Sequence, residues 1–129
     1  MKEQRLNPST LPKPPAAYCQ VVRKGGLVTT AGMVSQNADG EVIGEGDIEI
    51  QTRQVLENLK IALREVGASF KDIVKTTIFL SDMAYYKGMN TVFNEYFEGK
   101  TPARSTVQAG LALPSLLVEI EAIAVIDEE

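Results

Sequence analysis

The sequence predicts an α+β fold of two layers, in which two amphipathic helices cover one face of a β-sheet. Apolar residues recur at helical spacing in two stretches, residues 47–66 and 82–96. Short segments rich in β-branched residues lie around both stretches, which is typical of strands. The chain has 129 residues, the size of one domain, so we expect a single domain over residues 1–129.

The first third of the chain predicts an extended arm followed by strands. Residues 1–15 contain four of the six prolines, which disfavour a helix, so this segment is expected to form an extended Pro-rich arm. A strand is expected at residues 18–22. The glycine pair at residues 25–26 indicates a tight turn into a partner strand at residues 27–31. A short edge strand is expected at residues 41–43.

Two helices are predicted with local signals at their ends. Asp47 is suited to cap the first helix, and Gly67 is suited to end it. Ser81 or Asp82 is suited to cap the second helix, which is expected to end at Gly99. The apolar stripe of the first helix consists of Ile48, Val55, Leu59, Ala62 and Val66.

The remaining segments predict three strands. Residues 73–80 form the clearest central strand, a short strand begins near Arg104, and residues 117–126 form a long last strand. The first and last of these carry apolar residues on both faces. Because the helices cover only one sheet face, a second apolar face predicts association of chains, sheet against sheet.

Charge and composition exclude several classes of partner. Lys and Arg number 13 and Asp and Glu number 17, giving a net charge of -4. An acidic chain without a basic run is a poor binder of nucleic acid and of anionic membranes, so we expect neither partner. Apolar runs fall far short of the roughly 20 residues needed to span a bilayer. We therefore expect a soluble, cytoplasmic protein.

The residue types that are missing limit the chemistry. The chain has no His, which removes Ser-His-Asp and Cys-His catalysis and His metal sites. It has one Cys, Cys19, which we interpret as a small apolar residue, with a nucleophile as the alternative. We therefore expect no metal and no organic cofactor. An enzyme of this composition depends on Arg, Glu, Asp, Tyr, Thr, backbone groups or water.

Arg104 and Glu119 are the strongest candidates for chemistry. Arg104 enters a strand of small and polar residues, and its planar guanidinium suits a carboxylate or phosphate; the alternative is a surface arginine. Glu119 and Glu121 point to the same face of an apolar strand. Burial of that face raises their pKa values and makes a proton carrier, whereas exposure makes a solvent face. A hairpin of residues 104–110 with 117–125 would put Arg104 and both glutamates on one face.

The most specific segments resemble one known family. The resemblance extends over residues 16–126 and indicates the YjgF/RidA family of reactive-intermediate deaminases, also called L-PSP endoribonuclease-like proteins. It is carried by Phe79-Leu80-Ser81-Asp82-Met83, by Asn90, by Phe93-Asn94-Glu95-Tyr96-Phe97, by Pro102-Ala103-Arg104-Ser105 and by Val118-Glu119-Ile120-Glu121-Ala122-Ile123-Ala124.

The resemblance implies an architecture and an activity. The implied fold is chorismate-mutase-like, with a mixed sheet and two helices on one face. The implied assembly is a homotrimer with its sheets inward and clefts between subunits. The implied reaction is hydrolysis of 2-imino and enamino acids, such as 2-iminopropionate and 2-aminoacrylate, to 2-keto acids and ammonia, without a cofactor. Metabolite damage control is the implied role.

The resemblance also implies roles for individual residues. Arg104 matches the arginine that holds the substrate carboxylate, and Glu119 matches the glutamate that handles the attacking water. Tyr18 matches a tyrosine that lines the cleft from a neighbouring chain, and Asn90 matches an asparagine of the helix motif.

Two positions of the implied substrate pocket depart from the family pattern. Ala31, which precedes Gly32, stands where the family commonly has Ser, so a hydroxyl donor is lost. Thr106 stands two residues after Arg104, where Cys is frequent. These changes bear on substrate range and rate more than on the fold.

Three functions follow as hypotheses. The favoured one is an imine/enamine deaminase of small 2-imino and enamino acids of the 2-iminopropionate/2-aminoacrylate type, with a deaminase of another enamine, of the aminoacrylate or aminomuconate type, as an alternative. The second is a non-catalytic trimer that binds small carboxylates such as 2-keto acids, which Ala31 favours. The third, ribonuclease activity, is disfavoured by the net charge, the absence of His and the few aromatic residues.

Overall fold

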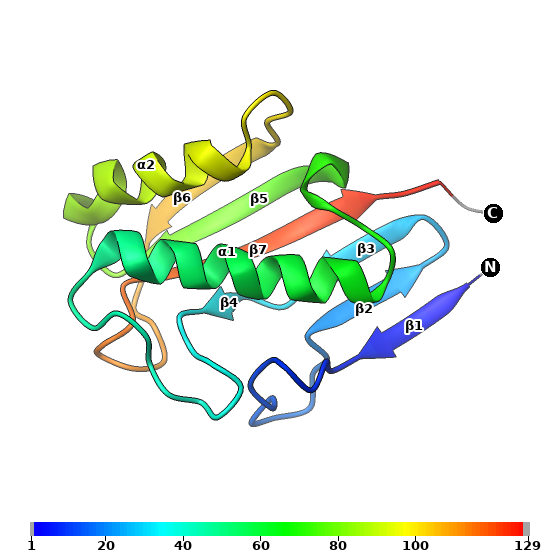
Figure 1. Ribbon diagram of the computed structural model, residues 1–129, viewed down its shortest axis with the longest axis horizontal. Helices are drawn as coiled ribbons and strands as arrows, with labels where there is room; N and C mark the ends of the chain where they lie inside the picture. Colours follow the sequence, from blue (N-terminus) through cyan, green and yellow to red (C-terminus); the bar gives the residue numbers. More distant parts are fainter. Residues whose placement is uncertain (1, 128–129) are drawn as a thin grey trace.

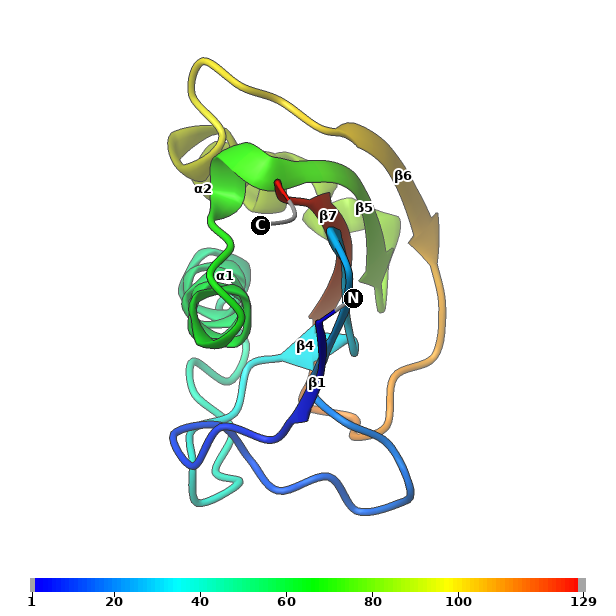
Figure 2. The same ribbon diagram turned by 90° about the vertical axis from the view of Figure 1, so that its right-hand side faces the viewer.

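The computed structural model describes residues 2–127 and has two layers, which confirms the predicted α+β fold. Figure 2 shows both α-helices side by side on one face of a curved sheet, with no helix on its other face. None of the helices described is long and apolar enough to cross a membrane. In chain order the elements are β1 (Glu3–Leu6), β2 (Val21–Lys24), β3 (Leu27–Thr30), β4 (Met33–Val34), α1 (Ile48–Glu65), η1 (Phe70–Asp72), β5 (Ile73–Leu80), η2 (Met83–Tyr85), α2 (Tyr86–Tyr96), β6 (Ala103–Gln108) and β7 (Val118–Val125).

The sheet is mixed, and its strand order separates β6 from β7. The order is β1-β2-β3-β7-β5-β6, and β4 also pairs with β7 (Figure 1). Strand β6 pairs in parallel with β5, whereas the other pairs are antiparallel. The predicted hairpin of residues 104–110 with 117–125 is therefore wrong. Helix α2 connects β5 to β6 as a crossover, and such a crossover returns the chain parallel to the strand that it leaves.

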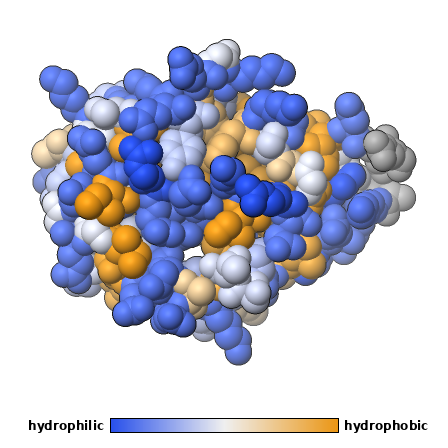
Figure 3. Space-filling model, in the orientation of Figure 1, coloured by the Kyte–Doolittle hydropathy of each residue, from blue (hydrophilic) through white to orange (hydrophobic). Residues whose placement is uncertain are grey.

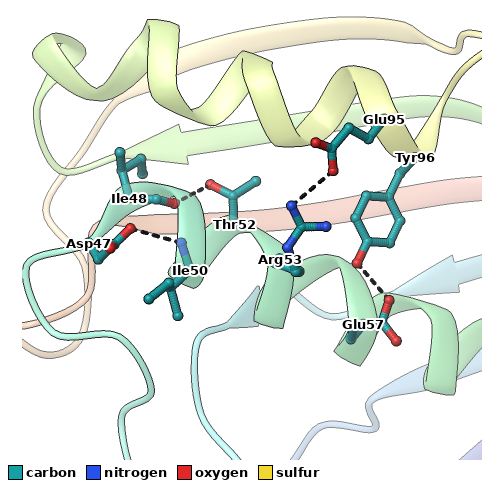
Figure 4. Close-up of polar contacts among 8 residues, drawn as sticks. All are labelled: Asp47, Ile48, Ile50, Thr52, Arg53, Glu57, Glu95 and Tyr96. Atoms are coloured by element: carbon teal, nitrogen blue, oxygen red, sulfur yellow. Dashed lines mark hydrogen bonds and ion pairs between the residues drawn. The ribbon is translucent and has the colours of Figure 1, made fainter.

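Both helices begin and end close to the predicted residues. The Asp47 carboxylate accepts a hydrogen bond of 3.0 Å from the Ile50 backbone N–H, so it caps α1 (Figure 4). Gly67 adopts a φ of 82° just after α1, where a left-handed residue ends a helix. Asp82 caps the short turn η2, which leads directly into α2.

Polar contacts join the two helices on their outer side. Arg53 of α1 lies 2.9 Å from the Glu95 carboxylate of α2, and the Tyr96 hydroxyl donates to Glu57 at 2.6 Å (Figure 4). Burial, and then the neighbouring Glu57, raises the pKa of Tyr96 to about 12, so this hydroxyl stays protonated. Exposed contacts of this kind each contribute little to stability, so the buried residues of α1 and α2 contribute most to their packing.

The N-terminal half differs from the prediction in four places. The strand expected at residues 18–22 begins later, as β2, so Tyr18 lies in the loop before it. The edge strand expected at residues 41–43 is reduced to one bridge between Gln36 and Val42. Strand β1 forms within the expected arm and pairs with β2. Because β4 has two residues, no periodicity in the sequence signals it.

The apolar core lies between the helices and the sheet. Along β7 the residues alternate, so that Ile120 and Ala124 are buried under the helices while Ile123 and Val125 are 39% and 53% exposed on the other face. Figure 3 shows the helix-covered side, where hydrophilic residues surround separate apolar groups. On the opposite, uncovered face of the sheet, the exposed apolar side chains include Leu27, Val107, Ile123 and Val125.

Candidate functional site

The backbone between β3 and β4 brings a glycine against a carboxylate. Strands β3 and β4 pair with successive parts of β7, and Ala31 and Gly32 lie at the break between them. The Ala31 N–H donates to the Gln20 carbonyl at 2.9 Å, which holds the break in place. The Gly32 backbone then lies directly beside the Glu119 side chain of β7. The position of the Glu119 side chain thus depends on a residue without a side chain at position 32.

A cavity of about 380 Å³ opens at this break. Four of the predicted site residues line it: Tyr18, Ala31, Gly32 and Glu119. The rest of its wall is mainly apolar and consists of Pro15, Val34, Gln36, Ala112, Leu113 and Leu116. We call this space the Glu119 cavity. It offers one carboxylate and one phenol to a ligand held against an apolar wall.

The environment of Glu119 alters its protonation. Burial, and then the neighbouring charge of Glu121, raises the pKa of the Glu119 carboxyl above its ordinary value. The two glutamates share the uncovered face of β7, as their spacing predicted. Across residues 2–127, no group of three His, Cys, Asp or Glu side chains could hold a metal ion. A carboxylate with a raised pKa is suited to accept and return a proton.

Gly32→Ala is expected to lower activity without lowering stability. A Cβ at position 32 would lie within 2.9 Å of the Glu119 Cγ, closer than real contacts allow. Because Glu119 is flexible, its carboxylate is expected to rotate away, and a misplaced catalytic group costs about 10² in rate. The free energy of unfolding should change by less than about 1 kcal/mol. The coupled assay described under Proposed function and urea denaturation of the same sample measure both effects.

Gly110→Ala is the matched control for this substitution. A Cβ at Gly110 meets nothing within 4 Å, so the added methyl group displaces no neighbour. The control is expected to retain wild-type kinetics. Wild-type kinetics in Gly32→Ala as well would contradict the role that we assign to the close approach of Gly32 and Glu119.

Arg104 lies in a second cluster, between β6 and α2. Its Nη1 donates to the Asn90 side-chain carbonyl at 2.8 Å, and its Nη2 donates to the Tyr86 hydroxyl at 3.0 Å. Its guanidinium carbon is 4.9 Å from the centre of the buried Phe93 ring. We call these four residues the Arg104 cluster. Thr106 lies two residues further along β6, on the same face of the strand as Arg104.

The two groups of residues lie on opposite faces of the sheet in one chain. Arg104 pairs with the buried Thr76 of β5, which faces the helices, whereas Glu119 pairs with Phe79 on the uncovered side. Strand β5 lies between the strands that carry them. The prediction that Arg104 and Glu119 share a face is therefore wrong. Side chains that alternate along paired strands, and the insertion of β5, separate the two residues.

Tyr86 is a member of the Arg104 cluster that the sequence analysis missed. It precedes Asn90 by four residues and Phe93 by seven, a spacing that places all three on one side of α2. That signal was present in the sequence. The neighbouring Tyr85 packs against the core instead, so the sequence offers two adjacent tyrosines of which only Tyr86 contacts Arg104.

Comparison with known proteins finds a matching family model and a named relative of similar length. The model of the family described as "Endoribonuclease L-PSP" matches residues 9–126. A protein of Acinetobacter baylyi named 3-aminoacrylate deaminase RutC is 37% identical over 124 residues, which cover 96% of this chain and 98% of the relative.

Solved structures of similar proteins share the fold. The YjgF gene product of E. coli has a TM-score of 0.85 and 32% identity, and the match covers 95% of this chain and 98% of that one. E. coli TdcF, solved with bound serine, has a TM-score of 0.87 and 31% identity, and the match covers 96% of this chain and 99% of that one.

Proposed function

This chain belongs to the endoribonuclease L-PSP family, also known as the YjgF/RidA family, and we propose that it is a hydrolytic deaminase of small 2-imino and enamino acids. The observation that carries the proposal is Glu119, a partly buried carboxylate with a raised pKa in a cavity that has both polar and apolar walls. A relative named as a 3-aminoacrylate deaminase supports the same reaction class.

The proposed site is completed by a second copy of the chain in a homotrimer. One chain holds Glu119 on the uncovered face and Arg104 on the helix side, so a ligand cannot meet both within that chain. The exposed apolar residues Ile123 and Val125 support an assembly in which uncovered faces meet. In such an assembly, the Arg104 cluster of one subunit would close the Glu119 cavity of its neighbour.

The proposed reaction needs one group that orients the substrate and one group that carries a proton. Arg104 would bind the substrate carboxylate through two of its N–H groups, and Asn90 would hold the guanidinium in place. Glu119 would take a proton from water as the water oxygen bonds to the imine carbon. The electron pair of the C=N double bond moves to nitrogen, which takes that proton from Glu119. The new hydroxyl group then passes its proton through Glu119 to nitrogen, and its oxygen forms the C=O bond as the C–N bond breaks, so ammonia and a 2-keto acid leave.

The other predicted residues would shape the pocket. The Tyr18 phenol is 47% exposed at the cavity, so it is accessible to a ligand. Gly32 lets the backbone approach closely, and the Ala31 methyl group adds apolar surface where a hydroxyl would add a donor. Thr106 would lie beside the bound carboxylate, because it shares a strand face with Arg104. This set suits a small substrate with one carboxylate.

A coupled assay with an arginine variant tests the proposal. A dehydratase generates 2-iminopropionate from serine, and the rate of keto-acid formation is followed with and without this protein. Arg104→Ala is expected to lower kcat/KM by about 10² or more, because the loss of a charged partner costs 2–5 kcal/mol or more. Arg64→Ala, at an exposed position of α1, is the control and should match the wild type. Unchanged turnover in Arg104→Ala would contradict the proposal.

A non-catalytic carboxylate-binding trimer is the second candidate, and the cavity residue Ala31 favours it. A methyl group there leaves the cavity with one hydroxyl fewer than the common family pattern. Calorimetry with 2-ketobutyrate, together with the absence of any acceleration in the coupled assay, would support this candidate over the deaminase.

A further inference from the structure

Tyr86 is placed to contribute more than packing. Tyr86 is the first residue of α2, and its side chain is 41% exposed. Its hydroxyl accepts a hydrogen bond from Arg104 of β6. The position of this helix end is fixed, because the Met83 backbone N–H donates to the Gln108 side-chain carbonyl at 2.9 Å. Gln108 is the last residue of β6, so strand and helix are joined beside the phenol.

The hydrogen bond between these side chains has only one possible direction. A guanidinium carries donors and no acceptor, so the Tyr86 oxygen accepts from Arg104 at 3.0 Å. The hydrogen of the phenol therefore remains free to donate elsewhere. Arg104 uses two of its five N–H groups on Asn90 and Tyr86, which leaves three for a ligand.

We propose that Tyr86 is a second carboxylate-binding residue beside Arg104, donating its phenolic hydrogen to the same substrate carboxylate that the guanidinium holds. This inference rests on the proposed function, since it assigns the Arg104 cluster to the substrate carboxylate. A carboxylate oxygen beside Nη2 lies within reach of the adjacent hydroxyl. Tyr86 then selects for planar carboxylates, with two acceptor oxygens, over neutral amides.

The proposal gives the phenol a distinctive pH dependence. Hydrogen bonding from Asn90, and then the positive charge of Arg104, lowers the pKa of Tyr86 below its ordinary value. Arg104 of β6 is the charged group that acts on this hydroxyl. Ionised Tyr86 has no hydrogen to donate and repels a carboxylate. Affinity for a carboxylate is therefore expected to fall on the alkaline side.

Tyr86→Phe, studied with 2-ketobutyrate as the probe, tests this. At neutral pH the variant should raise the Kd of 2-ketobutyrate, and the KM of the coupled assay, about tenfold, with kcat within about twofold of the wild type. The alkaline loss of affinity should be present in the wild type and absent from the variant. Tyr85→Phe, at the neighbouring core-packed tyrosine, is the control and should keep both the affinity and the alkaline loss.

The outcomes separate this inference from the proposed function. If Arg104→Ala abolishes turnover but Tyr86→Phe has wild-type affinity at every pH, the role of Tyr86 is overturned and the deaminase proposal stands. If Arg104→Ala retains turnover, the deaminase proposal fails, whereas the calorimetric comparison still decides the role of Tyr86. A wild-type protein that binds no 2-ketobutyrate, or an alkaline loss that persists in Tyr86→Phe, also overturns the inference.

Discussion

Glu119→Gln is expected to lower kcat of the deaminase by about 10²–10⁴, the range that general acid–base groups contribute. Glutamine keeps the size of the side chain beside Gly32 but cannot take a proton from water. Substrate binding through Arg104 should persist, so the KM is expected to change little. The coupled assay measures both constants, and a variant with the wild-type kcat would remove Glu119 from the mechanism.

The raised pKa of Glu119 also gives this prediction a pH dependence. The base form is the carboxylate, so wild-type activity should fall on acidification at a higher pH than an ordinary glutamate would give. Because the folded-state pKa exceeds the unfolded value, the stability that protonation contributes is present at low pH and is lost as pH rises through the raised pKa. Glu119→Gln is therefore expected to raise Tm at neutral pH while lowering kcat.

Ile120→Asp is expected to unfold the chain or to lower its free energy of unfolding by about 4–5 kcal/mol. Ile120 is fully buried on the helix side of β7, between Ile78 of β5 and Met33 of β4. A carboxylate there has no partner and must be desolvated or protonated. Against a total stability of 5–15 kcal/mol for ordinary domains, this loss is severe. Circular dichroism and urea denaturation measure it.

Ile123→Asp is the matched control on the same strand. The residue type and the new charge are the same, but Ile123 lies on the uncovered face and is 39% exposed. This variant is expected to keep its secondary structure and, if the wild type forms the proposed trimer, to elute at a smaller size than the wild type in size-exclusion chromatography. A folded Ile120→Asp with wild-type stability would refute the assignment of the two faces of β7.

Local signals predicted the helices because their ends are encoded by single residues. Asp47 and Gly67 bracket α1 in the structure as they do in the sequence, since an N-cap carboxylate and a left-handed glycine act over a few residues. The partner of β6 could not be predicted in this way. Its parallel pairing with β5 depends on how α2 returns the chain to the sheet, which is a property of the whole fold.

The candidate site was predicted residue by residue but not in its arrangement. Glu119, Tyr18 and Gly32 line one cavity, and Asn90 contacts Arg104, while the functional roles of these residues stay predictions. Sequence spacing gives the face of a strand but not the strand that lies next to it. The separation of Arg104 from Glu119 therefore emerged only from the topology.

The placement of Arg104 and Glu119 on opposite faces of one chain has a genetic consequence. In the proposed trimer, every site takes its arginine from one polypeptide and its glutamate from another. Two alleles that are each inactive, one damaged at the arginine and one at the glutamate, would together supply intact sites when their products assemble. When inactive chains of either kind assemble with wild-type chains, some sites receive the damaged residue. The activity of such a mixture would therefore fall below that of the wild type.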